Sequence, residues 1–172
     1  ILKEHFDRFM EIGLQPPEIK ENNECKNCKL FDDKEKLKLW RNNLKGLEHK
    51  DEKNNILLHG AVDNILKKGK KLIVLDYKTR GYPLKEDSHE HYQAQLNLYN
   101  FLLRKNNYET EDYAFLLFYY PKEVLETGEV VFDTVLKKIK TSADDGERLF
   151  LKAIKVIKGD MPKKRCVWCG ER

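Results

Sequence analysis

Long hydrophobic segments are missing from this sequence of 172 residues. No apolar run approaches the roughly 20 residues that a membrane-spanning helix needs, and no secretory apolar segment opens the chain. We therefore expect a cytoplasmic protein with no membrane partner. Internal repeats, a Walker-type glycine loop and an ordered Ser-His-Asp set are also lacking, which argues against solenoids, P-loop NTPases and serine hydrolases. The length predicts a single domain over residues 1–172.

Charge of one sign is not in large excess. The chain has 33 Lys and Arg against 29 Asp and Glu, a net charge of +4, which permits binding to nucleic acid without requiring it. Local clusters are more informative than the total, and three are rich in lysine, at residues 67–71, 137–140 and 163–165. Each cluster is consistent with a solvated surface and with a contact to phosphate.

Cysteine is scarce, and its four positions form two C-x-x-C pairs, Cys25 with Cys28 and Cys166 with Cys169. Paired cysteines of this kind are typical of a tetrathiolate metal site. Disulfides are the competing interpretation, and they are disfavoured because cytosolic thiols are kept reduced. Since the pairs lie near opposite ends of the chain, one metal bound to all four would join the N- and C-terminal segments.

A predicted β-hairpin carries acidic residues within an apolar context. Two apolar runs, residues 56–66 and 72–77, flank a polar Lys-Lys-Gly-Lys tip, which is the pattern of two strands and a turn. If Gly69-Lys70 is a two-residue turn with glycine first, the register places Asp63 directly opposite Asp76. Opposed carboxylates destabilise a sheet unless a cation neutralises them.

A divalent cation is the usual neutralising partner for such a pair. Asp63, Asp76 and the backbone carbonyl of Tyr77 would form a hard oxygen site suited to Mg²⁺ or Mn²⁺. Strand alternation places Lys78 on the face of Asp76, where it could orient or activate a metal-bound water. The alternative interpretation is a surface hairpin whose charges are solvated.

Three motifs in order carry a resemblance to a known family. They are Gly60-Ala-Val-Asp63, Asp76-Tyr-Lys78-Thr-Arg-Gly81 and Gln95-Leu-Asn-Leu-Tyr99. This series is similar to the G-x-x-D, D-x-K-T and Q-x-x-x-Y motifs of the PD-(D/E)XK nuclease superfamily. The branch that it resembles most is the RecB-like nucleases, which include the CRISPR-associated exonucleases.

The resemblance implies roles for particular residues. Asp63, Asp76 and Lys78 would be catalytic, with the two acids binding Mg²⁺ or Mn²⁺. Gln95 and Tyr99, one turn apart on a helix, would contact DNA or support the metal site. An upstream helix in this branch often supplies a further His or Glu ligand, which makes His5 a candidate beside the alternative of an ordinary surface or packing histidine. Other possible donors of this ligand are Glu48, His49 and Glu52.

The order of predicted elements agrees with the restriction-endonuclease-like core of this family. Apolar periodicity predicts helices near residues 1–12, 31–44, 88–104 and 141–158, and a polar connector at 46–55. The run 113–120 is apolar throughout, as expected of a strand buried on both faces, and 128–136 predicts a second strand. We expect an α/β fold with a mixed sheet flanked by helices.

Two kinds of metal centre are compatible with the four cysteines. Several RecB-like nucleases hold an iron–sulfur cluster with cysteines near both ends, but their usual pattern is one early and three late. The two-plus-two arrangement here is more similar to paired zinc knuckles. We therefore favour Zn²⁺ at Cys25, Cys28, Cys166 and Cys169, with a [4Fe–4S] cluster as the alternative.

The sequence as a whole predicts a metal-dependent DNA nuclease, and the resemblance favours an exonuclease acting on DNA ends or single strands. A second hypothesis is a catalytically inactive module of the same fold that binds nucleic acid or assembles into a larger helicase, CRISPR or repair complex. A third makes the cysteine site the functional centre, as a zinc-dependent interaction domain. Retention of Asp63, Asp76 and Lys78 together favours the enzyme. Strand type, polarity and oligomeric state are left open by the sequence.

Overall fold

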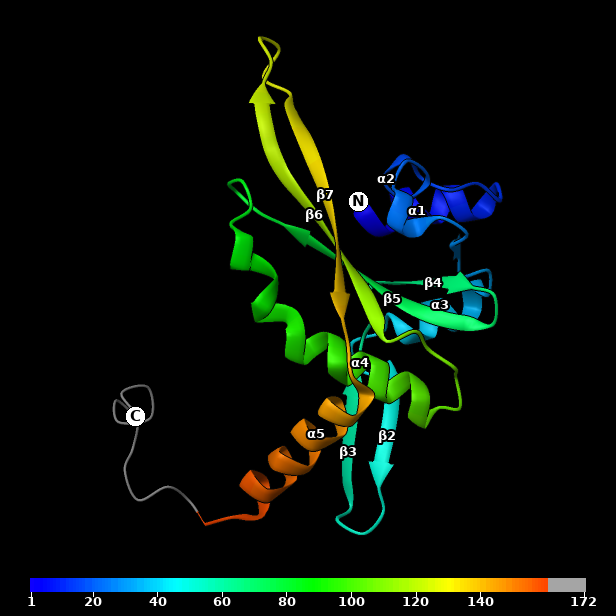
Figure 1. Ribbon diagram of the computed structural model, residues 1–172, viewed down its shortest axis with the longest axis vertical. Helices are drawn as coiled ribbons and strands as arrows, with labels where there is room; N and C mark the ends of the chain where they lie inside the picture. Colours follow the sequence, from blue (N-terminus) through cyan, green and yellow to red (C-terminus); the bar gives the residue numbers. More distant parts are fainter. Residues whose placement is uncertain (161–172) are drawn as a thin grey trace.

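The computed structural model describes residues 1–160, which form a five-stranded mixed sheet with helices on both faces and a separate two-stranded hairpin (Figure 1). The helical elements are α1 (Leu2–Glu11), α2 (Pro17–Lys20), η1 (Asn23–Cys25), α3 (Lys34–Trp40), η2 (Glu86–Tyr92), α4 (Gln93–Lys105) and α5 (Ala143–Lys158). The strands are β1 (Lys29–Leu30), β2 (Leu47–Asp51), β3 (Ile56–Gly60), β4 (Asn64–Lys68), β5 (Lys71–Thr79), β6 (Tyr113–Val124) and β7 (Val130–Lys140). Within this part of the chain, no helix has the length and apolar character to cross a bilayer.

The main sheet has the order β1-β4-β5-β6-β7. Only β5 and β6 pair in parallel, and α4 forms part of the connection between them, as a parallel pair requires. Helix α4 covers one face and packs against α5, while α1 and α2 lie on the other face (Figure 1). The predicted α/β fold with a mixed sheet between helices is therefore confirmed.

Strand β6 is buried on both faces along its first half. Ala114, Leu116 and Phe118 pack into the core beneath α4, whereas Phe115 and Leu117 pack with α1 and α2. A strand between two helical layers needs apolar residues at successive positions, which explains the continuous run in the sequence. The strand continues beyond the predicted run 113–120 and includes Pro121, which lies at a register irregularity where the ladder tolerates a missing N–H.

The predicted turn and register between β4 and β5 are confirmed. Gly69 has φ +60°, a conformation that favours glycine, and Lys68 pairs with Lys71 across the turn. The last pair of this antiparallel ladder is Asn64 with Leu75. One further step in the same register places Asp63 opposite Asp76.

The predicted strand over residues 56–66 is wrong in extent, because it is two strands in two sheets. The first, β3, pairs with β2, which lies in the stretch expected to be a connector. Between β3 and β4 the chain leaves the hairpin, and the Val62 N–H donates to the carbonyl of Trp40 at the end of α3, at 3.1 Å. Gly60 lets the end of β3 pack closely against α4, since a Cβ there would lie 2.9 Å from the Tyr99 ring.

Side-chain capping residues begin two of the α-helices, α3 and α5. Asp33 and Ser142 cap α3 and α5 by accepting backbone N–H groups, as their positions predict. Ser88 does not begin the long helix. Its Oγ accepts from the Lys85 N–H and so organises the 3₁₀ turn η2, and the α-helix starts only at Gln93.

Candidate active site

The predicted acidic pair lies where β4 and β5 separate, beside the N-terminal half of α4. The Tyr77 N–H donates to Asp63 Oδ2 at 3.1 Å, which holds the Asp63 side chain against β5. The Lys78 ammonium forms an ion pair with the Asp76 carboxylate. The structure therefore brings Asp63, Asp76 and Lys78 together.

Helix α4 adds a chain of hydrogen bonds to this group. Lys78 Nζ donates to Gln95 Oε1 at 3.4 Å, and Gln95 Nε2 lies 2.8 Å from the Tyr99 hydroxyl. Tyr99 in turn donates to the Ala61 carbonyl at 2.8 Å, two residues before Asp63. One turn of helix separates Gln95 from Tyr99, so both side chains reach the same edge of the sheet.

Asp76 is a strongly buried carboxylate, with only 2 % of its surface exposed. Burial raises the pKa of Asp76, and the attraction of the Lys78 ammonium opposes that shift without cancelling it. The nearby charge of Asp63 raises this pKa further. A buried acid next to a second acid is stabilised in its ionised form by an additional cation.

Lys3, at the start of α1, takes part in this site without having been predicted. Its Nζ lies 3.0 Å from Asp63 Oδ1, and its charge also lowers the pKa of Asp76. Lys3 and Lys78 thus bring one ammonium group to each carboxylate. Their presence is consistent with a site that is built to hold positive charge.

The donor set fits a hard divalent cation. Successive peptide groups of a strand point to alternate edges, and the Arg80 N–H donates to Tyr119 on β6 at 2.9 Å. The peptide groups of Tyr77 therefore face the opposite edge, where its N–H meets Asp63. The Tyr77 carbonyl shares that edge. Two carboxylates and this carbonyl are oxygen ligands of the kind that Mg²⁺ and Mn²⁺ prefer.

The structure does not bring His5 to the acidic pair. Its Nε2 lies 3.1 Å from Glu18 Oε1, and its ring packs edge-on against Phe6 and Phe9. His5 lies two residues after Lys3 in α1, which is a rotation of about 200° around the helix axis at 3.6 residues per turn. The two side chains therefore leave nearly opposite sides of the helix. Throughout residues 1–160, no group of three or more His, Cys, Asp or Glu side chains is arranged to hold a metal. The metal role of His5 remains a prediction that these contacts do not support.

Arg41 is a second residue that sequence reasoning missed. Its Nε donates to the Asp63 carbonyl at 2.7 Å, and its Nη1 lies 2.8 Å from both carboxylate oxygens of Asp7 on α1. This side chain is 12 % exposed and links α1 and α3 to the start of β4. The spacing of Lys3 and Asp7, four residues apart, was the available signal that one face of α1 is functional. No local pattern indicated Arg41.

The cysteines are only partly within the described chain. Cys25 and Cys28 are free, buried and close enough for a side-chain hydrogen bond, which lowers the pKa of Cys28 to about 7 and raises that of Cys25. Lys68 and Lys138 contribute to the lowering at Cys28. Cys166 and Cys169 lie outside the described residues. A metal site joining the four cysteines is not shown, and it remains a prediction.

Comparison with known proteins identifies one family. A search of the curated proteins found no match. A family model for the PD-(D/E)XK nuclease superfamily matches residues 9–170, a range that contains Asp63, Asp76, Lys78, Gln95 and Tyr99. The RecB-like branch and a CRISPR association stay predictions. The mixed sheet and the helices on its two faces agree with this match, and the chain belongs to the PD-(D/E)XK nuclease superfamily.

Proposed function

We propose that this protein is a DNA nuclease that hydrolyses phosphodiester bonds with Mg²⁺ or Mn²⁺ held by Asp63, Asp76 and the Tyr77 carbonyl. The observation that carries the proposal is the meeting of Asp63, Lys78 and the 2 % exposed Asp76 at one point of the sheet. When bound, such an ion supplies Lewis-acid chemistry at a phosphoryl oxygen and lowers the pKa of a coordinated water.

Lys78 is suited to act beside the acids. Its side chain is 18 % exposed, and its Nζ lies 4.6 Å from the centre of the Tyr92 ring and within reach of Gln95. These contacts would hold the Lys78 ammonium at the site if Asp76 bound a metal. From there it can hydrogen-bond the attacking water and offset the negative charge that develops on the phosphate. Gln95 and Tyr99 would keep the Lys78 ammonium oriented towards the acidic pair.

We extend the proposal to an exonuclease that acts on DNA ends or single strands. The motif series supports this extension through its similarity to the RecB-like branch. We also propose that the nuclease acts as part of a helicase, CRISPR or repair complex.

Incubation of the purified protein with end-labelled single- and double-stranded DNA tests the function. We expect cleavage with Mn²⁺ or Mg²⁺ and none with chelator. Early release of the terminal label as a very short product would indicate an exonuclease, whereas a spread of long fragments would indicate an endonuclease. DNA binding without cleavage under all metal conditions would instead favour the inactive binding module.

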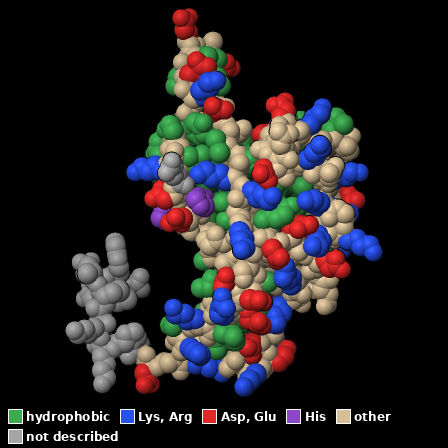
Figure 2. Space-filling model, viewed as in Figure 1, with side chains coloured by type: hydrophobic (Ala, Val, Ile, Leu, Met, Phe, Trp, Pro, Cys, Tyr) green, Lys and Arg blue, Asp and Glu red, His purple; other side chains and the backbone are tan. Residues whose placement is uncertain are grey.

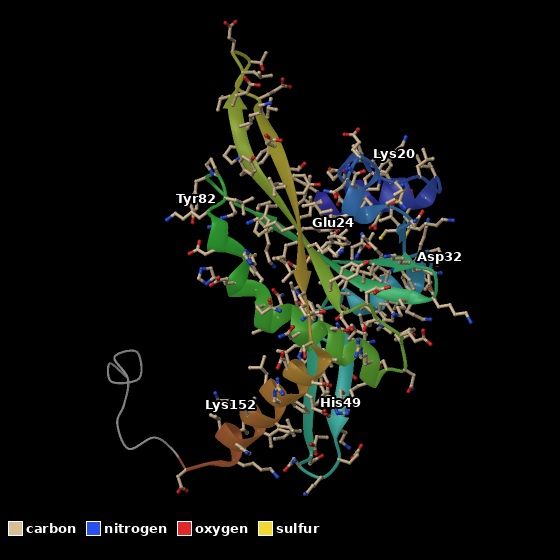
Figure 3. The ribbon with its side chains drawn as sticks, viewed as in Figure 1. Lys20, Glu24, Asp32, His49, Tyr82 and Lys152 are labelled. Atoms are coloured by element: carbon tan, nitrogen blue, oxygen red, sulfur yellow. The ribbon has the colours of Figure 1, made fainter. Side chains whose placement is uncertain are left out.

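Replacing Lys3 by Met should strengthen metal binding. A cation at Asp63 must displace the Lys3 ammonium, and a partly exposed ion pair contributes about 0.2–1 kcal/mol. We therefore expect the apparent Kd for Mn²⁺ to fall about two- to fivefold in titration calorimetry. Lys20→Met, on α2 and away from the site, is the matched control (Figure 3). Equal affinity in both variants would show that Lys3 does not compete with the metal.

A further inference from the structure

The chain keeps the geometry of β5 beyond Lys78, as far as Arg80. The Arg80 N–H donates to the Tyr119 carbonyl at 2.9 Å, which keeps the chain in strand geometry for one residue past the end of β5. Because side chains alternate, Arg80 projects from the same face as Lys78, about 6.6 Å further along. Neighbouring phosphates of an extended DNA strand are separated by a similar distance. The two cations are therefore placed to meet consecutive phosphates.

The loop after Arg80 presents an aromatic ring to solvent. Tyr82 is 55 % exposed, and Figure 3 shows it at the outer side of the loop between β5 and α4. Arg80 Nη2 donates to the Tyr82 hydroxyl at 2.9 Å, and the guanidinium carbon lies 4.8 Å from the ring centre. Arg80 and, more weakly, Lys85 lower the pKa of this hydroxyl, so both cations lie near the ring.

This exposed ring is positioned by anchors on both sides. Before it, Arg80 is joined to β6, and after it Leu84 packs against the core beneath α4. Next in the chain, the Lys85 N–H donates to Ser88 Oγ at 3.0 Å. Because the loop is fixed on both sides of Tyr82, little conformational entropy is lost when a ligand binds to the ring.

The local chemistry matches single-stranded DNA. On the face shown in Figure 2, basic and acidic side chains are interspersed. Asp87 and Glu90 on η2 are exposed acidic residues close in sequence to Lys85. Proteins that bind single strands combine cations along the phosphates with aromatic rings that stack on bases. In a duplex the bases are already stacked and paired, so a ring beside the strand has no free base to contact.

We propose that Arg80 and Tyr82 bind the strand next to the bond to be cleaved, Arg80 at a phosphate and Tyr82 stacked on an unpaired base, so that the site selects single-stranded DNA. This inference rests on the proposed nuclease function, since that function places DNA at Lys78. Tyr82 is a binding residue here and takes no part in the chemical step.

Binding to a fluorescent single-stranded oligonucleotide of about 15 nucleotides tests the inference, with Ca²⁺ in place of Mg²⁺ so that affinity is measured without hydrolysis. A series of such oligonucleotides carries one abasic nucleotide at successive positions. Wild-type protein should lose about tenfold in affinity when the missing base is the one that Tyr82 contacts. Tyr82→Ala should show the same loss on the intact oligonucleotide and no position-dependent loss on the abasic series.

Matched variants separate stacking from other effects. Tyr82→Phe keeps the ring and should bind close to wild type, and Ile157→Ala removes a 68 % exposed side chain on α5 and should change nothing. Arg80→Gln should reduce the slope of log affinity against log salt by about 0.7, the value for one phosphate contact on a single strand. A blunt duplex of the same sequence should bind Tyr82→Ala and wild type equally.

The inference is overturned if Tyr82→Ala binds the intact single strand as tightly as wild type, or if it keeps the position-dependent abasic effect. Equal losses on single strand and duplex would also overturn it. Failure of the proposed function is a separate result: a protein that shows the abasic effect in Ca²⁺ but cleaves nothing in Mg²⁺ or Mn²⁺ has the binding surface without the nuclease activity.

Discussion

Asp76→Asn is expected to reduce metal-dependent DNA cleavage by about a thousandfold or more. The substitution removes a negatively charged ligand from the site, and a bound metal contributes several kcal/mol at the transition state, where about 1.4 kcal/mol is tenfold in rate. Lys78→Met should cost about a hundred- to a thousandfold, as for loss of one group that stabilises developing charge. Initial cleavage rates of a labelled single-stranded substrate in Mn²⁺ measure both effects. A rate within threefold of wild type, on the order of the usual scatter, would remove Asp76 from the site.

The stability of the same variants provides the control for folding. Burial raises the pKa of Asp76 in the native state, so its ionised form opposes folding, and this contribution to stability falls as pH rises above the unfolded pKa. In chelator at neutral pH, Asp76→Asn should therefore melt at or above the wild-type temperature. Lys78→Met leaves the 2 % exposed Asp76 without its ion-pair partner and should lose about 1–3 kcal/mol. Reversal of this order would mean that Lys78 does not compensate Asp76.

Gly146→Leu should destabilise the protein by about 3 kcal/mol. A Cβ at Gly146 on α5 would lie 2.4 Å from the Asn97 carbonyl and 2.7 Å from Phe101 Cβ on α4, so the two helices must separate. Since one of the close atoms belongs to the backbone, rotation of a side chain cannot relieve the contact. Urea denaturation measures the effect as a lower midpoint.

Ala153→Leu is the matched control for this helix contact, because it adds a similar volume to an exposed position of the same helix. We expect its stability to lie within about 0.5 kcal/mol of wild type. If Gly146→Leu were equally mild, α4 and α5 would not depend on close backbone packing, and the position of Gln95 and Tyr99 on α4 would be less constrained than the structure indicates.

Local sequence patterns were sufficient for the centre of the site. The turn at Gly69 sets the register of β4 and β5, and extending that register by one residue past its last pair, Asn64 with Leu75, brings Asp63 next to Asp76. Strand alternation then assigns Lys78 to the face of Asp76, and helical spacing joins Gln95 to Tyr99. These relations depend on residues that are close in sequence or separated by one tight turn, so backbone geometry fixes them. The mixed sheet was predictable for the same reason, since its strands and helices have clear periodicity.

Contacts between distant segments were decided by the tertiary structure. Lys3 and Arg41 reach Asp63 from helices 60 and 22 residues away in the sequence, and His5, in spite of its chemistry, faces Glu18 instead. The partner of β3 was also missed, because a short strand carries no signal that distinguishes one edge from another. The sequence by itself determined the acidic pair and its lysine, since both follow from the register of one tight turn and from the alternation of side chains along a strand. Which side chains surround that pair depends on how whole helices dock, and docking is determined by burial summed over many residues rather than by any short pattern.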